Sequence, residues 1–199
     1  PITLSTVMQN IIDDKTLDAS QGIIRHGEGV DLLPSNIELS GFEVRLINAM
    51  SRERVLKTYV NEVKKNYDYV VIDCMPSLGM ITINALAAAD SVIIPTQPHY
   101  LSAKGLELLL RSVSMVKRQI NPKLRIDGIL MTMVMPRTNI SKEITATVKS
   151  AYGQKIKVFD TEIPHSIRAV EATAEGKSIF AYDKSGKVAA AYEQFSKEV

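Results

Sequence analysis

Residues 67–79 read Tyr67-Asp68-Tyr69-Val70-Val71-Ile72-Asp73-Cys74-Met75-Pro76-Ser77-Leu78-Gly79. The apolar run before Asp73 has no polar alternation, which is typical of a strand buried on both faces of a sheet. Asp73 would then stand just past the C-terminal end of the strand, where open α/β sheets place their ligands. Such an aspartate can hold Mg²⁺ through water in nucleotide hydrolases, but aspartate also caps helices and starts turns. These residues alone leave both roles open.

Helical and strand-like segments alternate on both sides of this run. Residues 51–66 are predicted to form a helix capped by Ser51, and residues 31–34 a strand end followed by a loop. Further helices are expected over residues 79–89, 101–120 and near 141–152, after Pro164, and at the C-terminus, with strands at 91–95, 126–133 and near 156–159. The alternation indicates an α/β fold, a layered, mainly parallel sheet flanked by helices, in a single domain over residues 1–199.

The clearest helix is the segment 101–120. Asn121 and Pro122 are expected to end it. Its apolar residues recur at helical spacing and are expected to face a core. They are Leu106, Leu109, Val113, Val116 and Ile120.

Composition favours one globular domain. The chain has 199 residues, of which 45% are hydrophobic and 23% charged. No apolar run approaches the roughly 18 to 20 residues that span a bilayer, and the first residues do not resemble a signal peptide. The single cysteine, Cys74, excludes an internal disulfide, and His26, His99 and His165 are scattered. A reducing, cytoplasmic compartment is therefore expected.

Charge is distributed unevenly along the chain, although the net charge is only +2. Residues 1–110 carry 9 Lys and Arg against 13 Asp and Glu, whereas residues 111–199 carry 15 against 9. The second part thus has a balance of +6. Such asymmetry is typical of a surface that meets an anionic partner, or of an ordinary solvated surface.

Residues 67–79 resemble the Walker B and switch II segment of the ParA family of P-loop ATPases. The resemblance continues in the same order along almost the whole chain. The further matching segments are 33–40, 82–86, 89–95, 105–106, 128–133, 136–138, 163–164, Arg168, 171–172, 176–178 and 182–183.

Two features depart from the family pattern. Met75 stands where the family usually has the first of two prolines. Family members also begin with a strand, a phosphate loop, a helix and a second strand, and the chain is expected to be the C-terminal portion of a ParA-type ATPase domain that lacks this unit. Gly176-Lys177-Ser178 ends like a phosphate loop, but position 171, where G-x-x-x-x-G-K-[ST] requires glycine, is Glu171. We therefore expect these residues to form an ordinary loop.

The resemblance implies a DNA-partitioning ATPase that segregates chromosomes or plasmids. It implies ATP and Mg²⁺ as cofactors, an ATP-dependent homodimer, non-specific DNA, a ParB-like partner protein, no membrane, and a cytoplasmic, nucleoid-associated location. The chain by itself is expected to contain no catalytic residue, to bind no nucleotide, and to expose the apolar faces and strand edges that the absent unit would cover. The implied roles are Asp73 at Mg²⁺ through water, Pro76 and Ser77 in switch II, Met133 and Pro164 at the adenine, and Arg168, Lys184 and Lys187 at DNA.

Several of these residues could instead have a purely structural role. Met133 and Pro164 can simply be a strand end and a helix start, and the Met133 and Met135 side chains are expected in the core. Arg168 can belong to a surface ion pair. Two other functions also remain: a MinD-like regulator that cycles on a membrane, and a non-catalytic interaction or DNA-binding module. The MinD-like regulator is disfavoured because the C-terminal segment 189–199 is short and not basic.

Overall fold

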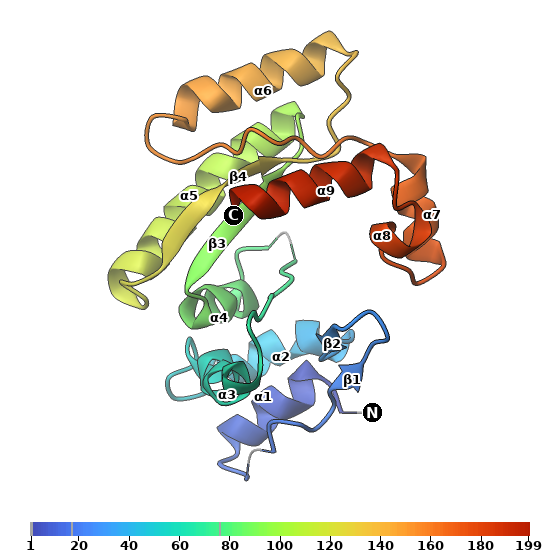
Figure 1. The fold of residues 1–199 in the computed structure, drawn as a ribbon. Coiled ribbons are helices and arrows are strands. Elements are labelled where there is room, and N and C mark those ends of the chain that lie inside the picture. The colour runs from blue at the N-terminus through green and yellow to red at the C-terminus, as the bar shows by residue number, and fades with distance from the viewer. Residues whose placement is uncertain (1, 17, 76) are drawn as a thin grey trace. The chain divides into compact units, whose positions relative to one another are not determined.

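The computed structural model describes residues 2–16, 18–75 and 77–199. Figure 1 shows the course of the chain through its helices and strands. In chain order the elements are α1 (Leu4–Ile12), β1 (Ile24–Arg25), β2 (Asp31–Leu32), α2 (Glu38–Leu46), α3 (Val55–Val63), the 3-10 helix η1 (Lys64–Asn66), α4 (Met80–Ala88), β3 (Ser91–Thr96), α5 (Tyr100–Gln119), β4 (Arg125–Met131), α6 (Asn139–Tyr152), α7 (Ile167–Ala174), α8 (Ile179–Tyr182) and α9 (Lys187–Glu198).

The chain divides into two compact units. Unit 1 contains residues 1–90 and 112–124, and unit 2 contains residues 91–111 and 125–199. The prediction of a single domain is not tested by this division.

Unit 1 is held together by helices. Apolar residues of α1, α2, α3 and α4 form one core, in which Met8 and Leu46 are fully buried. Asn84 is also fully buried; its side-chain oxygen accepts from the Leu56 amide at 3.1 Å and its nitrogen donates to the carbonyls of Arg52 and Met80. Because each of these polar atoms has a partner, Asn84 ties α4 to α3 without an unsatisfied buried group.

The apolar run before Asp73 lies in unit 1 and is not a strand. No helix or strand is assigned to residues 69–73, and Tyr69 and Val71 are 87% and 90% exposed. The prediction of a strand buried on both faces is therefore wrong for this chain. The physical reason is that a strand needs a hydrogen-bonded neighbour, and no strand of the described residues pairs with this run. The exposure agrees with the expectation that apolar surface would be left uncovered.

Unit 2 contains a parallel sheet that is covered on both faces. β3 pairs in parallel with β4, from Ser91 opposite Arg125 to Thr96 opposite Met131. Ile94, Ile129 and Met131 pack with residues of α5 and α6. Ile93 and Leu130 lie on the opposite face and pack with residues of α9. The strands at 91–95 and 126–133 are thus confirmed, as is the α/β class with a parallel sheet flanked by helices.

Residues 157–163 extend this sheet without forming the predicted strand at 156–159. A single parallel bridge joins Val158 to Ile129. Gly128 permits the close approach, since a Cβ on it would lie 2.7 Å from the Phe159 ring and 2.9 Å from the Lys157 carbonyl. Phe159 in turn meets Phe195 of α9 edge to face, with ring centroids 4.9 Å apart. The segment is therefore held both by this packing and by backbone hydrogen bonds to residues 129–134, among them the Phe159 amide to the Ile129 carbonyl at 3.0 Å and the Ile163 amide to the Met131 carbonyl at 2.9 Å.

The predicted helices are present, with changes at their ends. Asn121 follows α5 as expected, and its side chain donates to the carbonyls of Leu86 and Ala89. Ser51 does not cap α3: the helix begins after Arg54, and Ser51 has φ +51° in a turn.

Met133 and Met135 are 44% and 49% exposed, so the prediction that they lie in the core is wrong. Both follow the end of β4, where the sheet no longer supplies a covered face.

The apolar stripe of α5 faces inward as predicted. Leu106, Val113 and Val116 are buried, and Leu109 and Ile120 are partly buried. Three helices, α1, α2 and α8, were not expected from the sequence pattern.

Candidate functional site

Asp73 and Ser77 lie in unit 1, on the connection that leads into α4. Asp73 is exposed and has no hydrogen bond or ion pair among the described residues. Ser77 Oγ accepts from the Gly79 amide at 3.1 Å. Pro76, the other predicted switch II residue, lies outside the described residues. Asp73 is thus available to solvent, as a water-mediated metal ligand would need to be.

A residue that the sequence pattern did not predict lies at the start of α4. Glu43 of α2 accepts a hydrogen bond from the Ile81 amide at 3.1 Å, and a Cβ on Gly79 would overlap its carboxylate. A carboxylate here satisfies an amide of the first helical turn and interacts favourably with the helix dipole. Glu43 and Ile81 are 38 positions apart, so no local spacing rule could have found the contact.

Asp73 fits one part of a magnesium site. Within residues 2–16, 18–75 and 77–199, no three His, Cys, Asp or Glu side chains gather where they could hold a metal ion. Mg²⁺ in nucleotide sites takes one or two carboxylates and completes its shell with water and phosphate oxygens. One exposed carboxylate is compatible with this arrangement, and the other ligands would come from nucleotide and water.

Unit 2 brings Met133 and Pro164 to the same edge of its sheet. A parallel bridge joins Val134 to Pro164, with the Val134 amide donating to the Ile163 carbonyl at 3.0 Å. Met133 has φ +53°, a left-handed conformation that is uncommon for a residue with a long side chain, and Gln97 Nε2 lies 3.1 Å from its sulfur. Backbone strain of this kind is concentrated at ligand sites and turns. Because the bridge between Val134 and Pro164 joins the two segments, the two predicted base-contact residues are neighbours.

The three predicted DNA contacts lie in unit 2: Arg168 is in α7, Lys184 is in the turn between α8 and α9, and Lys187 begins α9. All three side chains are exposed. Arg168 forms the surface ion pair that the sequence left open as its structural role: Nη1 lies 3.7 Å from Glu171 Oε2. Hydrogen bonding to Tyr182, followed by the charge of Glu171, raises the pKa of Arg168 above its usual value. Lys184 and Lys187 have no ion pair among the described residues.

The positive balance of residues 111–199 does not come from this region. Residues 164–199 contain five Lys and Arg and five Asp and Glu, so their formal charge is zero. The whole +6 lies in residues 111–163. Charge asymmetry along the sequence therefore does not by itself point to α7–α9, and the argument for a DNA contact at Arg168 rests on the family resemblance.

Two other features are separate from these residues. Gly176-Lys177-Ser178 connects α7 to α8, and Ser178 Oγ caps α8 by accepting from the Ala181 amide, which confirms an ordinary loop.

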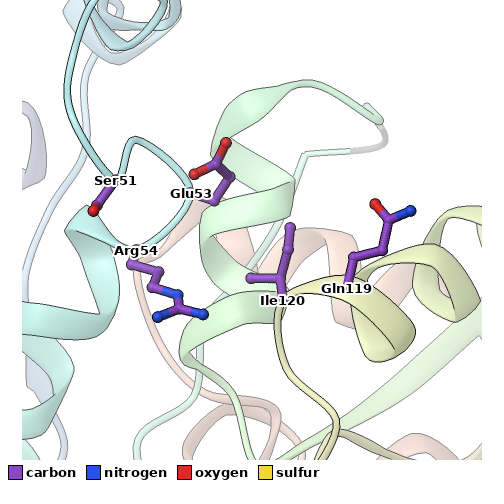
Figure 2. Close-up of a pocket in the computed structure, with 5 residues that line it drawn as sticks. All are labelled: Ser51, Glu53, Arg54, Gln119 and Ile120. Carbon is purple, nitrogen blue, oxygen red and sulfur yellow. The ribbon is translucent and has the colours of Figure 1, made fainter.

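Unit 1 has an open pocket of about 390 Å³. Figure 2 shows its lining side chains, from the turn before α3 and the end of α5. They are Ser51, Glu53, Arg54, Gln119 and Ile120, and none of them is a predicted site residue.

Comparison with known proteins identifies the family. A family model described as an AAA domain (AAA_31) matches residues 3–126. The chain is 44% identical over 172 residues to the sporulation initiation inhibitor protein Soj of Bacillus subtilis, covering 86% of this chain and 67% of that protein. It is 41% identical over 167 residues to the chromosome-partitioning ATPase Soj of Treponema pallidum, covering 84% and 65%.

A solved structure gives the same result for the fold. Cobyrinic acid a,c-diamide synthase from Mycobacterium smegmatis, with bound ADP and magnesium, superposes with a TM-score of 0.82 at 32% identity. The superposition covers 99% of this chain and 70% of that one. The fold and these matches define a P-loop ATPase domain of the α/β class. The chain belongs to the ParA family within that class.

No helix in the described ranges has both the length and the apolar composition needed to cross a bilayer. The chain spans about two thirds of the length of the two Soj proteins. What the whole protein does is therefore a matter of proposal.

Proposed function

We propose that this chain is part of a partition ATPase of the ParA type, which moves or positions DNA through an ATP-dependent dimer. The observation that carries the proposal is the 44% and 41% identity to two Soj proteins, one of them a chromosome-partitioning ATPase. The dimer binds DNA without sequence preference, and a ParB-like partner stimulates hydrolysis. The 199 residues contain no G-x-x-x-x-G-K-[ST] motif, so the proposal includes a phosphate loop supplied by residues outside them.

In this proposal the residues of the chain orient the cofactor and do not attack it. ATP and Mg²⁺ supply the reacting phosphoryl group and the charge that stabilises its transfer to water. Asp73 positions the metal through a water molecule, Pro76 and Ser77 lie in switch II, and Met133 and Pro164 line the adenine. The strained backbone of Met133 and the bridge of its neighbour Val134 to Pro164 support a rigid wall for the base.

The environment of α9 favours this proposal over a membrane-cycling regulator. A helix that binds a membrane surface needs a free apolar face. In α9, Val188 is buried and Phe195 packs against Phe159 within unit 2. The apolar side of the helix is thus used inside its own unit.

Hydrolysis by the intact protein, meaning this chain with its N-terminal phosphate-loop segment, tests the assignment of Asp73. Asp73→Ala is expected to abolish Mg²⁺-dependent phosphate release while leaving the circular dichroism spectrum and unfolding midpoint unchanged, because the exposed side chain contributes no core volume. Asp68→Ala removes an equally exposed carboxylate five positions earlier and serves as the matched control. Turnover by folded Asp73→Ala at the Asp68→Ala rate would remove Asp73 from the site.

DNA binding by the ATP-bound intact protein tests the second part. Affinity for unrelated duplexes is expected to be equal and to fall log-linearly with salt, because phosphate contacts release counterions. Arg168→Ala and Lys187→Ala should each reduce the slope by about one for every phosphate that the variant no longer binds. Lys142→Ala, an exposed lysine of α6, is the charge-matched control. If all three variants weaken binding equally, α7–α9 is not the DNA surface.

A further inference from the structure

Three side chains of α7 and α8 form one small cluster around Arg168. The Tyr182 hydroxyl donates to Glu171 Oε2 at 3.1 Å. The same oxygen lies 3.7 Å from Arg168 Nη1, and the Arg168 guanidinium carbon lies 6.0 Å from the centre of the Tyr182 ring. The carboxylate is thus held from one side by a hydroxyl while it faces the guanidinium on the other.

The Arg168–Glu171 pair is one of three ion pairs within residues 164–199, a segment whose formal charge is zero. Lys177 pairs with Glu175 at 2.7 Å, and Lys197 pairs with Glu193 at 3.0 Å. A surface that binds a polyanion through α7–α9 therefore carries its own carboxylates beside its cations. The Glu171 carboxylate differs from those of Glu175 and Glu193 because it also accepts a hydrogen bond from the Tyr182 hydroxyl.

We propose that Glu171 occupies the phosphate-binding position of Arg168, held there by Tyr182, and competes with DNA phosphate for the guanidinium. The inference rests on the proposed DNA-binding function and adds a restraint on it. A carboxylate and a phosphate use the same donors of an arginine, so they bind in exchange for one another. A DNA phosphate then gains less from Arg168 than it would without the Glu171 carboxylate beside the guanidinium.

The strength of the pair makes it a modest competitor. Arg168 and Glu171 are 65% and 47% exposed at their side chains and stand three residues apart on α7. Exposed pairs of this type change an equilibrium constant by at most about fivefold. DNA therefore still binds, but more weakly than the cations alone would allow.

Duplex binding by the ATP-bound intact protein at several salt concentrations tests the proposal. Glu171→Gln is expected to tighten binding about two- to fivefold and to keep the side-chain volume. Glu175→Gln makes the same charge change four positions away, where it frees Lys177, and reports the effect of removing a carboxylate that does not face Arg168. Tyr182→Phe removes the hydroxyl that holds Glu171 and that also hydrogen-bonds to Arg168, but it leaves the Glu171 charge, so its gain should be smaller than that of Glu171→Gln.

The double variant Arg168→Ala/Glu171→Gln completes a thermodynamic cycle. If Glu171 acts on Arg168, the gain from Glu171→Gln disappears when Arg168 is absent. A gain that persists in the double variant, or one no larger than that of Glu175→Gln, overturns the inference while leaving DNA binding intact. If the protein binds no duplex in any variant, both the inference and the proposed function fail. Circular dichroism confirms that each variant is folded.

Discussion

Two apolar runs of similar composition adopt different structures in this protein: one forms a strand and the other does not. Tyr69-Val70-Val71-Ile72 of unit 1 forms no strand, and two of its side chains are almost fully exposed. Ser91-Val92-Ile93-Ile94 of unit 2 forms β3, in which Ile94 is 2% exposed. The difference is a partner: β3 has β4 beside it and helices on both faces, whereas the first run has no strand beside it among the described residues. An apolar run can form a buried strand, but it does so only where the fold places another strand beside it.

Hydrogen exchange should show the largest contrast between the runs. Amides of β3 that point to β4 are expected to exchange more slowly than those of residues 69–72 by about two orders of magnitude or more, since core ladders open with a free energy near that of global unfolding. Mass spectrometry of overlapping peptides gives the measurement on this chain. Equal protection in the two peptides would show that residues 69–72 have a partner in solution.

Truncation of one side chain in each run gives a smaller contrast in stability. Ile94→Ala is expected to lower the free energy of unfolding by about 2–5 kcal/mol, because it leaves a cavity in the core. Val71→Ala should change it by no more than about 0.5 kcal/mol, because the side chain is already in water. Urea denaturation followed by circular dichroism provides both values.

Repeating these measurements in the intact protein sharpens the comparison. If the N-terminal segment supplies the neighbour, the cost of Val71→Ala rises towards that of a buried valine while the cost of Ile94→Ala stays the same. An unchanged Val71→Ala value in the intact protein would contradict the view that a partner strand is what the run lacks.

The smallest expected effect concerns the acid stability of unit 2. Glu198 accepts from the Thr161 side chain and from the Asp160 and Thr161 amides, so these bonds, led by that from the Thr161 hydroxyl, lower the pKa of the carboxyl. A lowered native pKa means that the carboxylate stabilises the fold at neutral pH and that this contribution is lost as the pH falls through the lowered native pKa. Glu198→Gln should therefore unfold at a slightly lower temperature at pH 7 and show a shallower loss of melting temperature on acidification. Glu193→Gln, on the exposed side of α9, controls for net charge.

Local pattern was sufficient for elements whose stabilising contacts lie close in sequence. Periodicity predicted the apolar stripe of α5 and the apolar runs of β3 and β4. Helix-stop residues predicted the end of α5 at Asn121, and the absence of a phosphate-loop glycine predicted the loop at Gly176. The family followed from residues 67–79 and the segments in order around them. The Arg168–Glu171 pair also has a local signal, since residues three apart lie on the same face of a helix.

Contacts between distant residues decided the rest. Whether residues 69–72 pair, whether Met133 is covered, and which carboxylate caps α4 all depend on which atoms the fold brings beside them. Glu43 meets Ile81 across 38 positions, and Glu198 meets Thr161 across 37. A strand ladder and a side-chain cap are both made of hydrogen bonds to partners that the segment does not contain. The residue types could therefore indicate what each segment was able to form, and only the tertiary structure supplied, or withheld, the partner.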